Sequence, residues 1–154
     1  MIKLILSDVD GTLTDGGMYY DNQGNELKKF NTRDGMGFKL AQSQGIKVGI
    51  ITGETTKIVE NRARKLQVDF LRQGVAGEGK LNAVKEICQQ LGITLSEVAY
   101  VGDDVGCVQL LSNVGLAACP ADAMPIVRNI PGIRVLTRKG GEGCVRELID
   151  TILA

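Results

Sequence analysis

Short apolar segments alternate with segments of helical periodicity along the chain, and this alternation restricts the fold more than any other feature. Apolar strands separated by helices are typical of a mostly parallel sheet covered on both faces. The sequence therefore predicts an α/β fold with a Rossmann-like, three-layer α/β/α architecture. Strands are expected at residues 2–6, 48–51, 68–71, 98–101, 114–118 and 133–136, and helices at 34–44, 55–66, 80–91, 103–112, 123–128 and 142–153.

Residues 17–30 interrupt this alternation. Two adjacent tyrosines, a polar turn at 21–25 and a second short arm predict a β-hairpin. We expect it to form a flap over the loop that follows the first strand, and a plain surface hairpin is the alternative. Only 43 residues separate Asp8 from Thr52, and hairpin, helix and strand fill them. We therefore expect one domain over residues 1–154, without a cap domain.

Charge and composition argue against several classes of function. The chain has 18 basic and 18 acidic side chains and no basic cluster, so we expect no nucleic-acid partner. No apolar run approaches the roughly 20 residues of a membrane span, and no export signal is evident, so we expect a cytoplasmic protein without a membrane partner. The lack of histidine and the four scattered cysteines argue against a zinc site, a disulfide framework and histidine-dependent nucleophilic catalysis.

Two aspartates follow the first predicted strand. Asp8 and Asp10 project to the same side of an extended backbone, because side chains alternate along a strand. Gly11 then permits a tight turn and a close approach to a ligand. Two carboxylates in this position could share one cation and one phosphate. The alternative is a polar junction between strand and loop with a capping aspartate.

Further polar residues follow the next strands. Thr52-Gly53-Glu54 comes after the second, before a predicted helix whose N–H groups favour a phosphate. Lys80 opens the helix after the third strand, and Asp103 and Asp104 follow the fourth. Ligands of open parallel sheets bind at the carboxyl ends of the strands. The sequence therefore predicts a phosphate-binding site at this edge.

Two other functional classes share some of these features. Residues 74–81 nearly match the phosphate-binding loop of nucleotide hydrolases, but Leu81 lacks the hydroxyl that such a loop supplies to Mg²⁺. A phospho-accepting signalling receiver would need an aspartate at the end of the third strand, where Arg72-Gln73-Gly74 stands. Both classes are therefore less favoured.

The order of these motifs resembles that of the haloacid dehalogenase superfamily of phosphohydrolases. More narrowly, the chain resembles the capless 3-deoxy-ulosonate phosphate phosphatases over essentially its whole length. The residues that carry the narrower resemblance are 8–17, Tyr20, 30–35, 50–53, 59–63, 73–75, 98–104 and 140–143.

The resemblance implies a role for each candidate residue. Asp8 would be the nucleophile that forms an aspartyl-phosphate, and Asp10 the general acid and base. Mg²⁺ would be the cofactor, bound by Asp8, the Asp10 backbone carbonyl and Asp103. The phosphoryl oxygens would be held by Thr52, Gly53 and Lys80.

The resemblance also bears on the substrate and the assembly. Glu54 and Lys65 favour a nine-carbon acid, ketodeoxynononate- or acylneuraminate-9-phosphate, and Thr32 is a further candidate specificity residue. The alternatives are 3-deoxy-D-manno-octulosonate-8-phosphate, or a catalytically weakened binding or scaffold protein. Arg33, Arg128 and Arg146 are candidates for contact with the sugar acid carboxylate. We expect a homotetramer, because the flap and a neighbouring subunit would cover the bare site.

Two departures from the family pattern bear on activity. Cys107 stands where relatives have an acid that orders metal-bound water or the lysine, and Asp104 is the candidate to replace it. Residues 76–79 also form a longer loop before Lys80 than relatives have. Losing such outer contacts of a metal site costs roughly 10–100-fold in affinity or activity.

Overall fold

The computed structural model describes residues 1–154 and contains one six-stranded, fully parallel sheet in the order β5-β4-β1-β6-β7-β8. The first strand therefore lies inside the sheet, with β4 and β6 as its neighbours. Each strand begins and ends within two residues of its expected position. The bounds are β1 Leu4–Ser7, β4 Lys47–Ile51, β5 Phe70–Arg72, β6 Val98–Val101, β7 Leu116–Cys119 and β8 Arg134–Val135.

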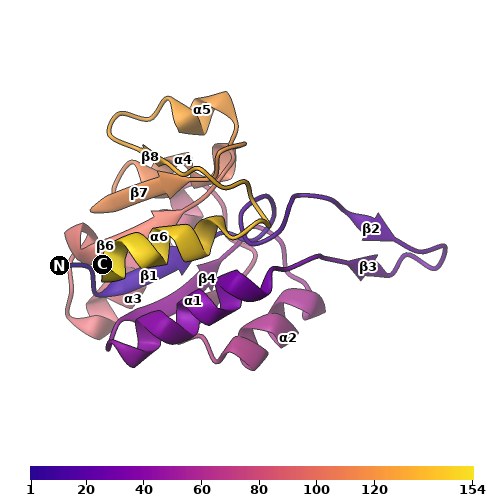
Figure 1. The fold of residues 1–154 in the computed structure, drawn as a ribbon, viewed down its shortest axis with the longest axis horizontal. Coiled ribbons are helices and arrows are strands. Elements are labelled where there is room, and N and C mark those ends of the chain that lie inside the picture. The colour runs from indigo at the N-terminus through magenta and orange to yellow at the C-terminus, as the bar shows by residue number, and fades with distance from the viewer.

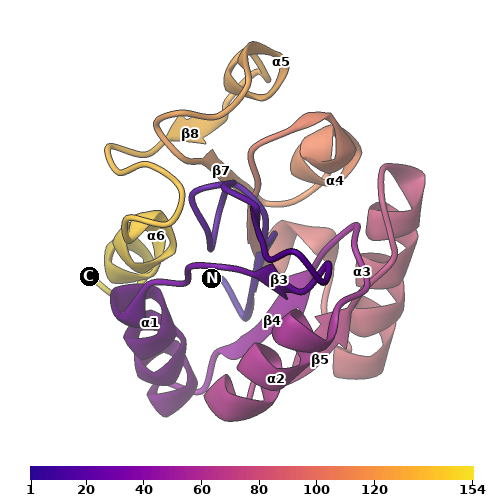
Figure 2. The ribbon, with the colours of Figure 1, turned by 90° about the vertical axis from the view of Figure 1, so that its right-hand side faces the viewer.

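Helices cover both faces of the sheet, which confirms the three-layer prediction (Figures 1 and 2). Successive residues of β1 point to opposite faces: Ile5 joins one core cluster, while Leu4 and Leu6 join the other. On the first face pack α1 (Thr32–Ser43), α2 (Lys57–Leu66) and α6 (Cys144–Leu153). On the second pack α3 (Glu78–Leu91), α4 (Val108–Leu111) and α5 (Pro125–Arg128).

The helix expected at 103–112 is wrong in its first half. A 3₁₀ turn, η2 (Val105–Cys107), precedes the four-residue helix α4, and another 3₁₀ turn, η1 (Leu95–Glu97), precedes β6. The Asp104 side chain accepts the Val105 N–H at 2.6 Å, so Asp104 caps the turn from outside it. Gly106 inside the turn further disfavours regular α-helix. Asp103 consequently lies in an extended segment directly after β6.

Residues 17–30 form the expected hairpin, and we call this segment the flap. Its strands β2 (Tyr19–Tyr20) and β3 (Glu26–Leu27) pair antiparallel, and they project from the body of the molecule in Figure 1. The second arm returns to the body, where Phe30 forms a bridge with Thr14. The flap thus connects the loop after β1 with the start of α1.

Two further observations concern the composition of the fold. All four cysteines are buried and free, as expected for small apolar residues in a core. None of the helices has the length and apolar character needed to cross a membrane.

Candidate active site

A cavity of about 200 Å³ opens at the carboxyl edge of the sheet, where β1, β4 and β6 end. The structure brings together here most of the residues that the sequence predicts for the site. Thr32 and Lys65 lie outside the cavity, exposed at the start of α1 and in the last turn of α2. The lining residues are Asp8, Asp10, Thr52, Gly53, Glu54, Ala76, Lys80, Asp103, Asp104, Gly106 and Cys107.

Asp8 and Lys80 form a buried ion pair at the base of this cavity. The Lys80 ammonium lies 3.1 Å from Asp8 Oδ1 and also donates to the Tyr100 hydroxyl at 3.0 Å. Burial alone would lower the pKa of Lys80, but Asp8 and Cys107 together outweigh it and the net shift is upward. The lysine therefore remains a cation at neutral pH, beside the predicted nucleophile.

Cys107, at the position where the resemblance implies an acid, lies at the base of the cavity. Its thiol donates to Asp8 Oδ2 at 3.2 Å and lies 3.4 Å from the Lys80 ammonium. Burial, and then the Asp8 charge, raises the pKa of this thiol to about 11, so it is neutral at pH 7. The base of the cavity thus has one negative charge fewer than the family pattern would give it.

Asp103 lies opposite Asp8 and is held by the loop after β1, since the Thr12 hydroxyl donates to Asp103 Oδ1 at 3.2 Å. Burial, and then the nearby Asp8 charge, raises the pKa of Asp103 to about 7. Two carboxylates held together in a buried site favour a bound cation. Ligand atoms of Asp8, Asp103 and Cys107 lie within 4.8 Å of one another. The carboxylate oxygens fit Mg²⁺, whereas the thiol is a softer donor that Mg²⁺ does not prefer.

The loop after β1 has a backbone conformation that requires Gly11. The Val9 carbonyl accepts three N–H groups, from residues 12–14, at 3.0, 2.9 and 3.1 Å. Gly11 has a φ of +82°, and a Cβ atom there would lie 2.0 Å from Asp103 Oδ2. Glycine therefore permits both the tight turn and the close approach of Asp103, as the sequence predicts.

A distant glycine pair packs against the same loop. The Gly141 N–H donates to the Thr12 carbonyl at 3.0 Å. A Cβ on Gly140 would lie 1.9 Å from the Gly11 carbonyl oxygen, so only glycine fits. The segment before α6 thereby supports the loop that carries Asp8 and Asp10.

Thr52 is buried at the end of β4, where its N–H donates to the Arg72 carbonyl at 2.9 Å. The helix that follows starts later than expected: α2 begins at Lys57, and the Thr56 hydroxyl caps it. Thr52-Gly53-Glu54 therefore belongs to a loop before the helix and not to its first turn. Phosphate contacts from this segment would come from a hydroxyl and loop N–H groups, without the helix dipole.

Sequence reasoning missed one charged residue at the site, Lys28 of the flap. Its ammonium lies 2.6 Å from Asp10 Oδ1. The available signal was Glu26 and Lys28 two residues apart on one hairpin arm, a spacing that places both side chains on the same side. The contact confirms that the flap arm reaches the loop carrying Asp10.

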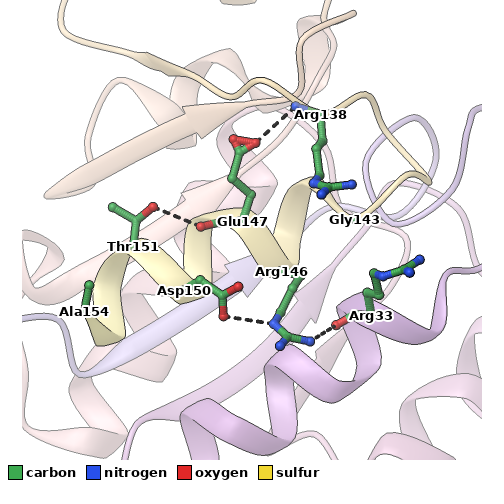
Figure 3. Close-up of a pocket in the computed structure, with 8 residues that line it drawn as sticks. All are labelled: Arg33, Arg138, Gly143, Arg146, Glu147, Asp150, Thr151 and Ala154. Carbon is green, nitrogen blue, oxygen red and sulfur yellow. Dashed lines mark hydrogen bonds and ion pairs between the residues drawn. The ribbon is translucent and has the colours of Figure 1, made fainter.

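The candidate arginines lie elsewhere. Arg33 and Arg146 line a larger cavity of about 670 Å³ at α1 and α6, together with Arg138 (Figure 3). Arg146 is paired there with Asp150, at 2.9 Å between Nε and Oδ1. Arg128 lines a third depression. No arginine lines the Asp8 cavity within this single chain.

Comparison with known proteins identifies the family to which these features belong. The family model of haloacid dehalogenase-like hydrolases matches residues 36–115. Together with the full-length relatives below, this match shows that the chain belongs to the haloacid dehalogenase-like hydrolases. The expected haloacid dehalogenase-like α/β fold is thereby confirmed.

Within the family, the chain is most informatively compared with one group of enzymes. It is 44% identical over 153 residues to the 3-deoxy-D-manno-octulosonate 8-phosphate phosphatase KdsC of Escherichia coli K12, covering 99% of this chain and 79% of that protein. The crystal structure of the Yersinia pestis phosphatase of the same name matches with a TM-score of 0.93 and 42% identity, covering 99% and 80% of the two chains. The Moraxella catarrhalis enzyme, solved in complex with magnesium ion, phosphate ion and a KDO molecule, matches with a TM-score of 0.92 and 36% identity, covering 99% and 86%.

Proposed function

We propose that this chain is a Mg²⁺-dependent phosphatase that hydrolyses 3-deoxy-D-manno-octulosonate 8-phosphate through an aspartyl-phosphate at Asp8. The similarity to enzymes of that name over 99% of the chain supports the substrate. The observation that carries the reaction type is the buried carboxylate of Asp8, placed between the Lys80 ammonium and Asp103 in one cavity. Residues 1–154 then act as one catalytic domain.

The first step joins an Asp8 carboxylate oxygen to phosphorus and breaks the bond between phosphorus and the sugar oxygen. Asp10 gives its proton to the departing alkoxide. In the second step a water oxygen attacks phosphorus, Asp10 takes a proton from that water, and the bond to Asp8 breaks. Inorganic phosphate leaves, and both aspartates return to their starting states.

The remaining residues bind the phosphoryl group and the cation. Lys80, Thr52 and the Gly53 N–H are placed to hold the oxygens on which charge develops. Asp8, Asp103 and the Asp10 carbonyl would hold Mg²⁺, which neutralises charge on the phosphate when it is bound. Asp104 lines the same cavity and is the carboxylate nearest in sequence that could order water in place of the missing acid.

A nine-carbon substrate is the second candidate. The comparisons favour the eight-carbon acid instead. The observation that favours the nine-carbon acid is Glu54. Its side chain lines the cavity and is 53% exposed, so it can meet sugar hydroxyls. We propose that Glu54 contributes to specificity, while Lys65 and Thr32 would reach substrate only across a subunit boundary.

Phosphate release tests the function directly. Purified protein with Mg²⁺ should hydrolyse the eight-carbon ulosonate phosphate with a higher kcat/KM than the nine-carbon one. Asp8→Asn should abolish turnover, a loss of at least about 10³-fold, because the nucleophile is gone. Asp150→Asn, an exposed carboxylate on α6, is the matched control and should leave activity unchanged. A reversed substrate ranking would establish the nine-carbon function, and an inert protein that still binds the sugar acid would establish a scaffold role.

We also propose that the chain forms a homotetramer. The flap presents Tyr19, Tyr20 and Leu27 at 49, 62 and 67% exposure, an apolar surface that a second copy would cover. Light scattering coupled to gel filtration should give four times the mass of the chain. A monomer at micromolar concentration would contradict this proposal.

A further inference from the structure

The ammonium of Lys28 is shared by three carboxylates from three different segments. It lies 2.6 Å from Asp10 in the loop after β1, 3.2 Å from Glu26 in β3 and 3.5 Å from Glu54 in the loop after β4. The Lys28 side chain is only 1% exposed. A buried lysine with three acidic partners joins the flap to both sides of the cavity.

Apart from Phe30 at its base, which packs against the core, the flap makes little apolar contact with the body. Each of its strands has two residues, and an isolated two-stranded hairpin is marginally stable at best. Met18, Tyr19, Tyr20 and Leu27 are 40 to 67% exposed instead of packed against the body. In Figure 1 the flap extends away from the sheet, with only its base near the helices. Beyond Phe30, the polar contacts of Lys28 attach the second arm to the loops after β1 and β4.

Electrostatics gives Lys28 a second effect. Without its ammonium, Asp10, Glu26 and Glu54 would face one another without a cation between them. The side chains of Asp10, Glu26 and Glu54 are 32, 16 and 53% exposed, so water screens part of their repulsion but no other cation lies between them. The same three carboxylates would also repel an arriving phosphate dianion. Burial is the largest single influence and lowers the pKa of Lys28, but the hydrogen bonds and charges of Asp10 and Glu26 together outweigh it, so the net shift is upward.

We propose that Lys28 is a positioning residue: it fixes the Asp10 carboxylate beside the cleaved bond and holds the flap over the sugar part of the substrate, next to Glu54. This inference rests on the proposed function of Asp10. Lys28 occupies Oδ1 of Asp10, which leaves Oδ2 to exchange the proton with the sugar oxygen and then with water. The flap arm and the acid-base residue consequently move as one unit.

The dependence on the leaving group tests this role. An alkyl phosphate needs a proton on its leaving oxygen, whereas p-nitrophenyl phosphate has a good leaving group and needs it little. The ratio kcat/KM covers only the steps up to departure of the leaving group. Lys28→Met should lower kcat/KM for the sugar acid phosphate by about 10–100-fold, because a misplaced catalytic group costs about that much. For p-nitrophenyl phosphate the loss should stay within about threefold.

Two variants accompany this measurement. Lys28→Arg keeps the charge and should restore at least about half of the lost selectivity between the two substrates. Lys29→Met, the neighbouring exposed lysine on the same arm, is the matched control and should resemble the wild type on both. Equal losses on both substrates would overturn the proposal, since a purely structural defect does not distinguish leaving groups. No loss on either would also overturn it.

Amide hydrogen exchange provides a second readout that does not depend on turnover. Lys28→Met should accelerate exchange at residues 26–30 by about tenfold, while Lys29→Met should not. Unchanged exchange in Lys28→Met would refute the attachment of the flap. Measurements on the wild-type protein separate the proposed function from the proposed role of Lys28. A wild-type protein that is inert on every phosphate ester contradicts the proposed function. The exchange data still decide whether Lys28 holds the flap.

Discussion

Asp34 provides the sharpest test of the electrostatics of this fold. Its carboxyl lies in α1, 1% exposed, and Oδ1 accepts the backbone N–H of Arg146 at 3.0 Å, while Oδ2 has no hydrogen-bond partner. Burial raises the pKa of Asp34 from 3.8 to about 6, although the backbone N–H groups of residues 145 and 146, and then the Arg62 and Arg138 charges, act in the opposite direction. The folded protein therefore binds a proton between about pH 4 and pH 6 that the unfolded chain has already released.

The sign and size of the effect follow from this difference. Because folding raises the pKa, ionisation of Asp34 opposes folding, and stability falls as the pH rises through about 6. A shift of about 2 pKa units lowers the free energy of unfolding at pH 7 by about 3 kcal/mol relative to strongly acidic solution. About 2.5 kcal/mol of this loss develops between pH 4 and pH 7. Asp34→Asn keeps the acceptor for Arg146 and removes the titration. Relative to the wild type, the variant should therefore gain about 2.5 kcal/mol between these pH values.

Urea unfolding at a series of pH values measures this gain. Any fixed cost of burying the amide NH₂ group cancels when the two pH values are compared. Asp150→Asn, which alters the exposed partner of Arg146, should give a curve parallel to the wild type. The reasoning would be refuted if the stability of Asp34→Asn changed with pH in parallel to that of the wild type. It would also be refuted if the wild type gained stability relative to the variant as the pH rose. The latter result would mean that the backbone N–H groups and the arginine charges around Asp34 dominate over burial.

Three further predictions concern the site. Cys107→Asp should lower the Mg²⁺ concentration for half-maximal activity by about tenfold or more, because it places a carboxylate beside the cation. An unchanged Mg²⁺ titration would contradict this role of a carboxylate at position 107. Gly140→Ala should lower the free energy of unfolding by about 2–4 kcal/mol in urea denaturation, since its Cβ would meet the Gly11 carbonyl. A loss below about 0.5 kcal/mol would show that the close approach is not needed. Chelation of Mg²⁺ should lower the melting temperature, because Asp8 and Asp103 repel each other without the cation, and added Mg²⁺ should restore it. Asp103→Asn should lose this response.

The convergence of Asp8, Thr52, Lys80 and Asp103 was predictable because a parallel sheet places the carboxyl ends of its strands along one edge. Each residue needed only a strand boundary correct to two positions. The least accurate prediction was the start of the helix after β6, where Gly106 and the Asp104 cap produce a 3₁₀ turn instead. Local competition of this kind depends on side-chain geometry that apolar periodicity does not capture.

Lys28 and Asp34 illustrate what the sequence could not supply. Lys28 meets Asp10 across 18 positions and Glu54 across 26, and Asp34 meets the Arg146 backbone across 112. The spacing of Glu26 and Lys28 places both side chains on one side of the hairpin but does not say what that side faces, and nothing in the local pattern distinguishes Asp34 from a solvated charge. Their burial is decided by where the flap and α6 come to rest, which only the assembled fold determines.

The packing of Gly140 and Gly141 against the loop after β1 bears on how the protein is made. The aspartates of that loop are translated before β6, and long before the glycine pair that packs against the same loop. Synthesis proceeds from the N-terminus, and early segments wait for their distant partners. The loop that carries Asp8 therefore gains this support only after Gly141 has been translated, and a nascent chain that stops before Gly141 lacks it.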